Sequence, residues 1–264
     1  MRHKLMKFFM GVVPFFAAEG IQMLVVILLS FLYGILSAFN IVSNNPQAAG
    51  NASYLFSAIA ILVCGIVFFF WYRNLIGKKE KRSFDRGTRF KSMVLIFLLG
   101  LGCQFAVSGF MSLIQTYFQE IFKKYAHTMK NLTSGNDILV YLLLILLAPI
   151  TEELIFRGVI LHKLKEEIPF FGANILQAVL FGIYHGNIVQ GIYATVLGLL
   201  LGYMYYKYRS ILAPIFLHII INASSIIIVL LPNTRSVYEI YLICGILCIA
   251  YSTQGIRKIS MDNF

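Results

Sequence analysis

Long apolar runs alternate with short polar stretches along the whole sequence. Eight runs approach the length of about 20 residues that a helix needs to cross a bilayer. Within lipid only helices and closed barrels satisfy their own backbone polar groups, and runs of this length favour helices. We therefore predict an all-α fold, a polytopic membrane helical bundle of about eight transmembrane helices. The predicted spans are 12–39, 53–72, 92–118, 137–161, 173–188, 191–206, 211–231 and 237–254.

Some of these runs carry more specific predictions. The fifth and sixth are short and joined by the tight turn "GNIVQG", so we expect a helical hairpin enclosed by protein. The first run extends to Phe39, which is too long for a signal peptide, and we expect an uncleaved span. Pro14 and Glu19 are expected to form an entry turn before its helix. The loop 119–137 is the one sizeable external segment that the pattern predicts.

Composition and charge support a membrane protein and predict its orientation. Hydrophobic residues make up 59% of the chain and charged residues 12%. Soluble domains usually have about 25% charged residues. The net charge of +11 comes from basic residues in short loops, which indicates membrane topology rather than nucleic-acid binding. With a cytoplasmic N-terminus, 17 Lys and Arg residues fall inside and 4 outside. We therefore predict cytoplasmic termini, a single membrane domain over 1–264, contact with the lipid bilayer and no nucleic-acid partner.

The four cysteines, Cys64, Cys103, Cys244 and Cys248, all fall in apolar segments and form no CxxC pair. Cysteines in such positions usually behave as small hydrophobic side chains. We therefore expect all four to be buried and to hold neither a disulfide nor a metal.

Polar and ionisable residues interrupt three of the predicted spans. Charge is costly within hydrocarbon, so such residues mark functional sites by default. Basic residues or a turn mark the cytoplasmic end of each of these spans. Counting the helical rise from those ends places all three groups roughly 13–20 Å from the cytoplasmic face. We therefore predict one buried site that draws on three helices. The residues are Glu152, Glu153 and Arg157 in the fourth span, His185 in the fifth, and His218 and Asn222 in the seventh.

Helical spacing separates the roles of these residues. Glu153 and Arg157 stand four residues apart and can form an ion pair on one helix face. Glu152 is turned about 100° away from that face. An apolar setting strengthens a carboxylate as a base, which suits Glu152 to general-base catalysis. His218 and Asn222 also stand four residues apart, so both can reach one point and stabilise an oxyanion.

Small residues surround the histidine of the fifth span and recur in the sixth. Such spacing lets helix backbones approach closely in a membrane. Pro149, just before the glutamates, is expected to loosen the helix beside the site. The glycines expected to permit close packing are Gly182, Gly186, Gly191, Gly198 and Gly202.

Three motifs occur in order within these spans: "EELIFR" matches EExxxR, "FGIYH" matches FxxxH, and "HIIIN" matches HxxxN. In this the sequence resembles the CAAX protease and bacteriocin-processing family (CPBP, also called Abi) of intramembrane endopeptidases. The resemblance covers about residues 140–225, and "GLLLGYMYYKYRSI" also fits the family's pattern. We therefore expect a catalytic core at 137–225. The helices of 1–118 carry no family-specific signal, and their role stays open.

The resemblance implies a role for each motif residue. Glu152 would activate a water molecule, and His185 would help to position or deprotonate it. His218 and Asn222 would hold the oxyanion. The catalytic residues implied in this way are Glu152, His185, His218 and Asn222, and the supporting residues are Glu153, Arg157 and Phe181.

Zinc is the alternative to a mechanism without a cofactor. Glu152, His185 and His218 are ligand types that zinc accepts. The sequence has no HExxH pair, however, and each candidate comes from a different helix. Asn222 is also a poor zinc ligand. The prediction is a glutamate mechanism without metal.

The function predicted from the sequence is hydrolysis of a peptide bond in a membrane-associated peptide or protein. Members of the family cleave prenylated C-terminal peptides, peptide pheromones or bacteriocin leaders, and the composition favours a peptide substrate in a bacterial plasma membrane. One alternative is a non-catalytic immunity or scaffold protein on the same fold. A proton-coupled transporter is another, because buried Glu and His also relay protons. The single depth of the polar groups counts against a transport path.

Overall fold

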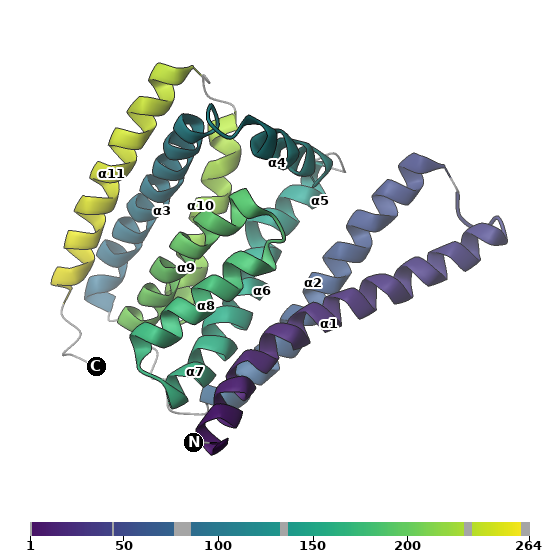
Figure 1. Ribbon diagram of the computed structural model, residues 1–264, viewed down its shortest axis with the longest axis horizontal. Coiled ribbons are helices and arrows are strands. Elements are labelled where there is room, and N and C mark those ends of the chain that lie inside the picture. Colours follow the sequence, from purple (N-terminus) through teal and green to yellow (C-terminus); the bar gives the residue numbers. More distant parts are fainter. Residues whose placement is uncertain (1, 44, 77–85, 133–136, 230–233, 260–264) are drawn as a thin grey trace. The chain divides into compact units, whose positions relative to one another are not determined.

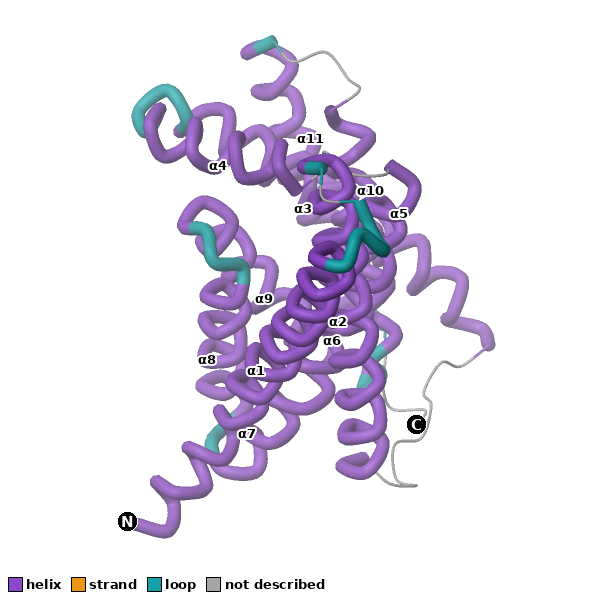
Figure 2. Tube along the Cα trace, turned by 90° about the vertical axis from the view of Figure 1, so that its right-hand side faces the viewer, coloured by secondary structure: helices purple, strands orange, loops and turns teal. Residues whose placement is uncertain are grey.

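The structure is a computed structural model that describes residues 2–43, 45–76, 86–132, 137–229 and 234–259. These residues form helices joined by short loops, and no strand occurs among them (Figure 2). Five helices are long and apolar enough to cross a membrane, and two shorter ones are also apolar. The protein is therefore a polytopic helical membrane protein, and the predicted fold class is confirmed at that level.

Helices occur at all eight predicted positions. The five long ones are α1 (Arg2–Ala38), α2 (Pro46–Ile76), α3 (Arg86–Ile114), α9 (Ile188–Tyr208) and α11 (Arg235–Lys258). The shorter apolar ones are α8 (Phe170–Tyr184) and α10 (Leu212–Val229). Several helices extend past the predicted ends, because their polar flanks stay helical beyond the apolar run.

The fourth predicted span is a helix built from five short pieces. It contains α5 (Asp137–Leu142), the π-helix η1 (Leu143–Leu147), α6 (Ala148–Glu153), the π-helix η2 (Leu154–Leu161) and α7 (His162–Glu167). Pro149 lies at the start of α6 and has no N–H to donate to the preceding turn. The wider π form directly before it agrees with the loosening expected at this proline.

Three expectations from the sequence need correction. The stretch 119–137, predicted to be a loop, holds a helix, α4 (Gln119–Leu132). No entry turn forms at Pro14 or Glu19, because α1 continues through both residues. Of the four free cysteines, Cys64 and Cys103 are buried as predicted, whereas Cys248 is half-buried and Cys244 is exposed. The exposure of Cys244 follows from its neighbour Gly245, which faces α3 and turns Cys244 away.

The chain divides into two compact units, Met1–Gly77 with Thr128–Ala173 and Lys78–His127 with Asn174–Phe264. In the first unit α1 packs against α2, and the broken fourth span packs against both (Figure 1). Phe15 of α1 meets Phe156 with ring centroids 6.5 Å apart. A methyl group added at Gly158 would lie 3.1 Å from the Tyr72 ring, so η2 and α2 approach closely there.

The second unit contains α3 packed along α11, with α10 against α3 and α9 (Figure 1). Glycines allow the close approach of α3 and α11. A methyl group at Gly102 would lie 3.0 Å from the Gly245 carbonyl oxygen. Phe105 and Tyr241 stack with centroids 5.2 Å apart. The pair is therefore held by close backbone approach at the glycines together with aromatic stacking.

The predicted helical hairpin is formed by α8 and α9. The expectation that protein encloses it is wrong, because Ile183, Ile188 and Ile192 are 60%, 65% and 59% exposed. Asn187 caps α9, because its side-chain oxygen accepts hydrogen bonds from the backbone N–H groups of Val189 and Gln190. Gly186 precedes the cap with a φ of +63°, a conformation that favours glycine. Its expected role in helix packing is therefore wrong, since no other residue lies within 4 Å of a methyl group built there. It makes the turn.

The other four glycines do bring the two hairpin helices together. A methyl group at Gly182 would lie 2.6 Å from the Gly191 carbonyl oxygen, too close for any side chain. Gly198 faces Ala178, and Gly202 faces the side chain of Asn174. The prediction of close packing in this hairpin is confirmed for these positions.

Candidate active site

A buried ion pair lies in the first unit, within the broken fourth span. Arg157 Nη1 donates to Glu153 Oε1 at 2.8 Å, and both side chains have 0% exposure. The predicted pair four residues apart is thus present. Charges removed from water need such a partner, because an uncompensated buried charge is strongly destabilising.

Aromatic rings enclose this ion pair. The guanidinium carbon of Arg157 lies 6.0 Å from the centroid of the Phe156 ring, at the limit for a cation–π contact. Phe156 is fully buried and in turn meets Phe15 of α1 edge-on. The pair is therefore part of the packed interior of the unit.

The residues before the ion pair attach α6 to α2. The Thr151 hydroxyl donates to the Ile61 carbonyl oxygen at 3.3 Å. A methyl group at Gly65 would lie 2.6 Å from the same hydroxyl oxygen, so only glycine fits there. Glu152 follows directly and is half-buried, whereas Thr151 and Glu153 on either side of it are fully buried. Of these three consecutive side chains, Glu152 alone is therefore open to a reactant.

Two π-helical segments, η1 and η2, flank the glutamates. Such wide turns are rare and occur often at functional sites. Neither the two π segments nor the attachment through Thr151 was predicted from the sequence. Pro149 is the one signal in the sequence that indicates an irregular helix here.

In the second unit, Phe181 brings the two histidines together. Its ring centroid lies 4.7 Å from that of His185, the residue that follows α8, and 5.8 Å from that of His218 on α10. Both contacts are edge-to-face, with interplanar angles of 89° and 87°. Phe181 is 2% exposed, so it holds both imidazoles from a fixed position.

The hydrogen bond of His185 fixes which of its nitrogens is available. Its Nδ1 lies 2.8 Å from the backbone carbonyl oxygen of Phe181. A carbonyl oxygen can only accept, so Nδ1 carries the hydrogen in this bond. In the neutral ring Nε2 then keeps its lone pair, and it is free to accept a proton or to orient a water molecule.

His218 and Asn222 both lie on α10, one turn apart. His218 is 6% exposed and Asn222 is half-buried. Their convergence on a single oxyanion stays a prediction. Glu152 belongs to the first unit and the two histidines to the second, so the joint site of all four residues also stays a prediction.

Two buried amides, which the sequence analysis missed, tie α8 to α9. Gln177 Nε2 donates to the Gly198 carbonyl oxygen at 2.9 Å and to Asn174 Oδ1 at 2.8 Å. Asn174 Nδ2 donates to the Leu199 carbonyl oxygen at 3.0 Å. The spacing of Asn174, Gln177 and Phe181 along one helix face was the available signal. These bonds orient α8, which carries Phe181 and leads into His185.

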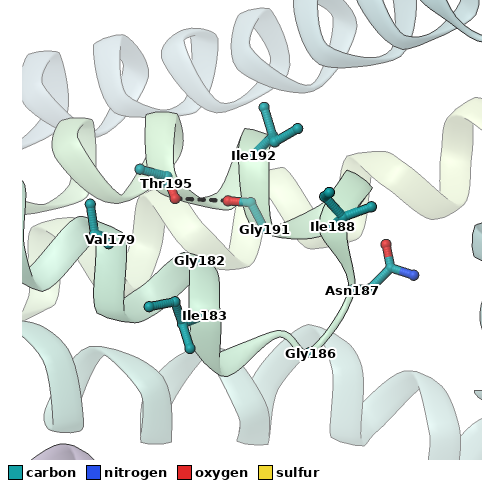
Figure 3. Close-up of a pocket in the computed structure, with 9 residues that line it drawn as sticks. All are labelled: Val179, Gly182, Ile183, Gly186, Asn187, Ile188, Gly191, Ile192 and Thr195. Carbon is teal, nitrogen blue, oxygen red and sulfur yellow. Dashed lines mark hydrogen bonds between the residues drawn. The ribbon is translucent and has the colours of Figure 1, made fainter. Parts of the chain in front are cut away.

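A shallow pocket of about 360 Å³ lies on the hairpin (Figure 3). Gly182 and Gly191 form its floor, and the Thr195 hydroxyl donates to the Gly191 carbonyl oxygen at 2.8 Å. Exposed isoleucines, Ile183 and Ile188 among them, form its rim. The pocket is apolar, as expected for a surface that meets lipid chains.

Comparison with known proteins agrees with these observations. Residues 134–224 match the family model described as "Type II CAAX prenyl endopeptidase Rce1-like", and all three motifs lie inside that range. A segment of 87 residues is 34% identical to "Putative membrane peptidase YdiL" of Bacillus subtilis (strain 168). The aligned segment is 33% of this chain and 36% of that relative, so the chain spans about a third of the relative's length. No solved structure matches the chain.

Proposed function

Residues 134–224 form a domain of the Rce1-like CAAX endopeptidase family, and from this premise we propose that the protein is an intramembrane endopeptidase. It hydrolyses a peptide bond in a membrane-associated peptide or protein. The observation that carries the proposal is the placement of the three motifs. Within the matched range, one unit holds a half-buried glutamate beside a buried ion pair, and the other holds two histidines against one phenylalanine.

In the proposed mechanism Glu152 is the general base. It takes a proton from a water molecule, whose oxygen attacks the carbonyl carbon of the substrate peptide. His185 orients that water through Nε2, the nitrogen not used by the bond to Phe181. His218 and Asn222 donate hydrogen bonds to the oxyanion. The C–N bond then breaks, and the proton held by Glu152 passes to the leaving amine.

Glu153 and Arg157 have a structural role in this proposal. Each is fully buried and engaged with the other, so neither reaches a substrate. The mechanism uses no metal, because every step is supplied by a carboxylate, two imidazoles and an amide. The zinc alternative, with Glu152 and both histidines as ligands, is tested by metal analysis below.

The proposed topology has eight spans and cytoplasmic termini, with the reaction near the cytoplasmic half of the bilayer. It rests on the distribution of Lys and Arg, of which many lie in 73–91. Residues 77–85 of that loop lie outside the described residues. A bacterial plasma membrane and a peptide substrate complete the proposal.

The proposed function is tested with the peptides of the host membrane. Cells that carry the wild type and cells that carry Glu152→Gln are compared by mass spectrometry of membrane peptides. A product present only with the wild type is then reproduced with purified protein and the synthetic precursor. Equal products in the two strains, from equal amounts of folded protein, would exclude the mechanism.

A further inference from the structure

A second pocket, distinct from the one on the hairpin, lies wholly in the first unit. It has a volume of about 480 Å³ and is lined by α2, by the broken fourth span and by Thr128 of α4. Sites for small ligands usually measure about 300–1,000 Å³, and one water molecule takes about 30 Å³. The pocket is therefore large enough for a segment of a ligand rather than for a single water.

Two rows of residues form the walls and lead toward the glutamates. On α2, Ser53, Ser57 and Ile61 line the pocket at every fourth position. On the facing helix, Leu144 and Ala148 line it, and the next position at that spacing is Glu152. Ala148 and Glu152 both belong to α6, where residues four apart follow one side of the helix, so the proposed base lies one turn beyond this wall.

The two rows meet where α6 is attached to α2. Ile61 lines the pocket, and its carbonyl oxygen accepts the hydrogen bond of Thr151, one residue before Glu152. Fully buried packing continues beyond that point at Glu153. The pocket therefore ends at Ile61 and Ala148, and Glu152 lies one helical turn beyond Ala148 along α6.

The chemistry of the walls indicates what the occupant brings. Ser53 donates to the Ala49 carbonyl oxygen and Ser57 to the Ser53 carbonyl oxygen, each at 3.0 Å. A hydroxyl that donates in this way keeps lone pairs that accept hydrogen bonds. The opposite wall, with Leu143 and Leu144, is apolar. The pocket thus fits an extended chain with N–H groups on one side and apolar side chains on the other.

We propose that this pocket binds the segment of the peptide substrate next to the bond that is cleaved. The proposal rests on the endopeptidase function proposed above and adds the place and polarity of substrate recognition. In the proposed topology the pocket opens toward the external half of the bilayer, because Ser53 lies near the external end of α2. The rival occupant is a column of water that supplies the reaction.

Photo-crosslinking tests occupancy without relying on turnover. The photoreactive residue p-benzoylphenylalanine is placed at position 57 in the Glu152→Gln protein, and at position 62 as the control. Leu62 lies outside the pocket and is 47% exposed on the same helix. The probe is a biotinylated apolar peptide, the best-cleaved member of a panel of internally quenched peptides. The proposal requires a crosslink at 57 that unlabelled peptide displaces, with little at 62, and equal labelling at both positions overturns it.

Kinetics then separate peptide from water. Ala148→Phe fills the pocket beside Leu144 and should raise KM for the quenched peptide at least about tenfold, at unchanged melting temperature. The control is Leu146→Phe, in the same segment but outside the pocket and 41% exposed, which should leave KM unchanged. A fall in kcat at constant KM, without a crosslink at 57, would assign the pocket to water.

The two proposals fail in different ways. If no peptide of the panel is cleaved by the wild type, the endopeptidase function fails, and crosslinking of the whole panel still decides whether the pocket takes a peptide. If peptides are cleaved but neither the crosslink nor the KM effect appears, only the pocket assignment is lost.

Discussion

Neutralising Glu153 and neutralising Glu152 should each reduce activity, but for different physical reasons. Glu153→Gln removes the negatively charged partner of Arg157. The Arg157 side chain has 0% exposure, so bulk water cannot replace that partner. Breaking a buried pair by removal of one partner costs about 3–5 kcal/mol. For a domain of this size, that is a fall in melting temperature of roughly 10 °C. Activity should fall in step with the folded fraction.

Glu152→Gln should behave in the opposite way. The side chain is half-buried, and the amide keeps its shape and most of its hydrogen-bonding capacity. The melting temperature should therefore change little. Loss of a general base costs on the order of 10²–10⁴ in rate, so turnover should fall by that factor with the protein fully folded.

The assay measures melting temperature and turnover for both single variants in one detergent. The double variant Glu153→Gln with Arg157→Gln is the matched control, because it strands no charge and should recover part of the lost stability. An active Glu152→Gln protein beside a folded but inactive Glu153→Gln protein would show that the two roles are reversed.

Four further predictions concern topology, metal and the second unit. Cysteine-accessibility tagging should place 78–89 in the cytoplasm and 123–130 outside, and labelling of 78–89 in intact cells would contradict the topology. Purified protein should keep its activity in a chelator, whereas stoichiometric zinc with chelator-sensitive, zinc-restored activity would require the metal mechanism. Gly182→Ala should prevent the hairpin from closing and abolish folding, whereas Gly186→Ala, with a positive φ but open surroundings, should lower the free energy of unfolding by only about 1–2 kcal/mol. Phe181→Leu should lower kcat roughly tenfold, since both imidazoles lose one wall. Its cost in stability, measured by thermal unfolding, should be about 1.5 kcal/mol or less, and an unchanged kcat would contradict the positioning role.

The helices could be predicted well from the sequence because the surrounding lipid requires helical structure. Every apolar run of sufficient length must become a helix that satisfies its own backbone. The pair of Glu153 and Arg157 was equally predictable, because contact between residues four apart is a local property of a helix. A tight turn in the hairpin was predicted too, but its geometry was not, because Gly186 was assigned to helix packing and is instead the left-handed residue before the Asn187 cap.

What the sequence did not predict depends on neighbours in space. The π segments η1 and η2 escaped because pattern arguments assume one period along a helix. Cys244 was expected to be buried, but it is exposed because the neighbouring Gly245 occupies the face of α11 that contacts α3. In a uniformly apolar run, the sequence does not show which face of the helix is buried. Gln177 was missed because an amide in an apolar run has a role only once the carbonyl group of Gly198 lies within reach.

The proposed catalytic groups are oriented by contacts inside their own units. In the first unit, Thr151 and Glu153 on either side of Glu152 are fixed by α2 and Arg157, so the backbone that carries the base has little freedom. In the second unit, Phe181 fixes both imidazoles, and its carbonyl group sets the tautomer of His185. A reaction that needs a correctly oriented base and hydrogen-bond donor is accelerated most when both groups are held rigidly before the substrate binds. In the proposed mechanism, binding energy of the substrate need therefore not be spent on ordering the base of the first unit or the imidazoles of the second.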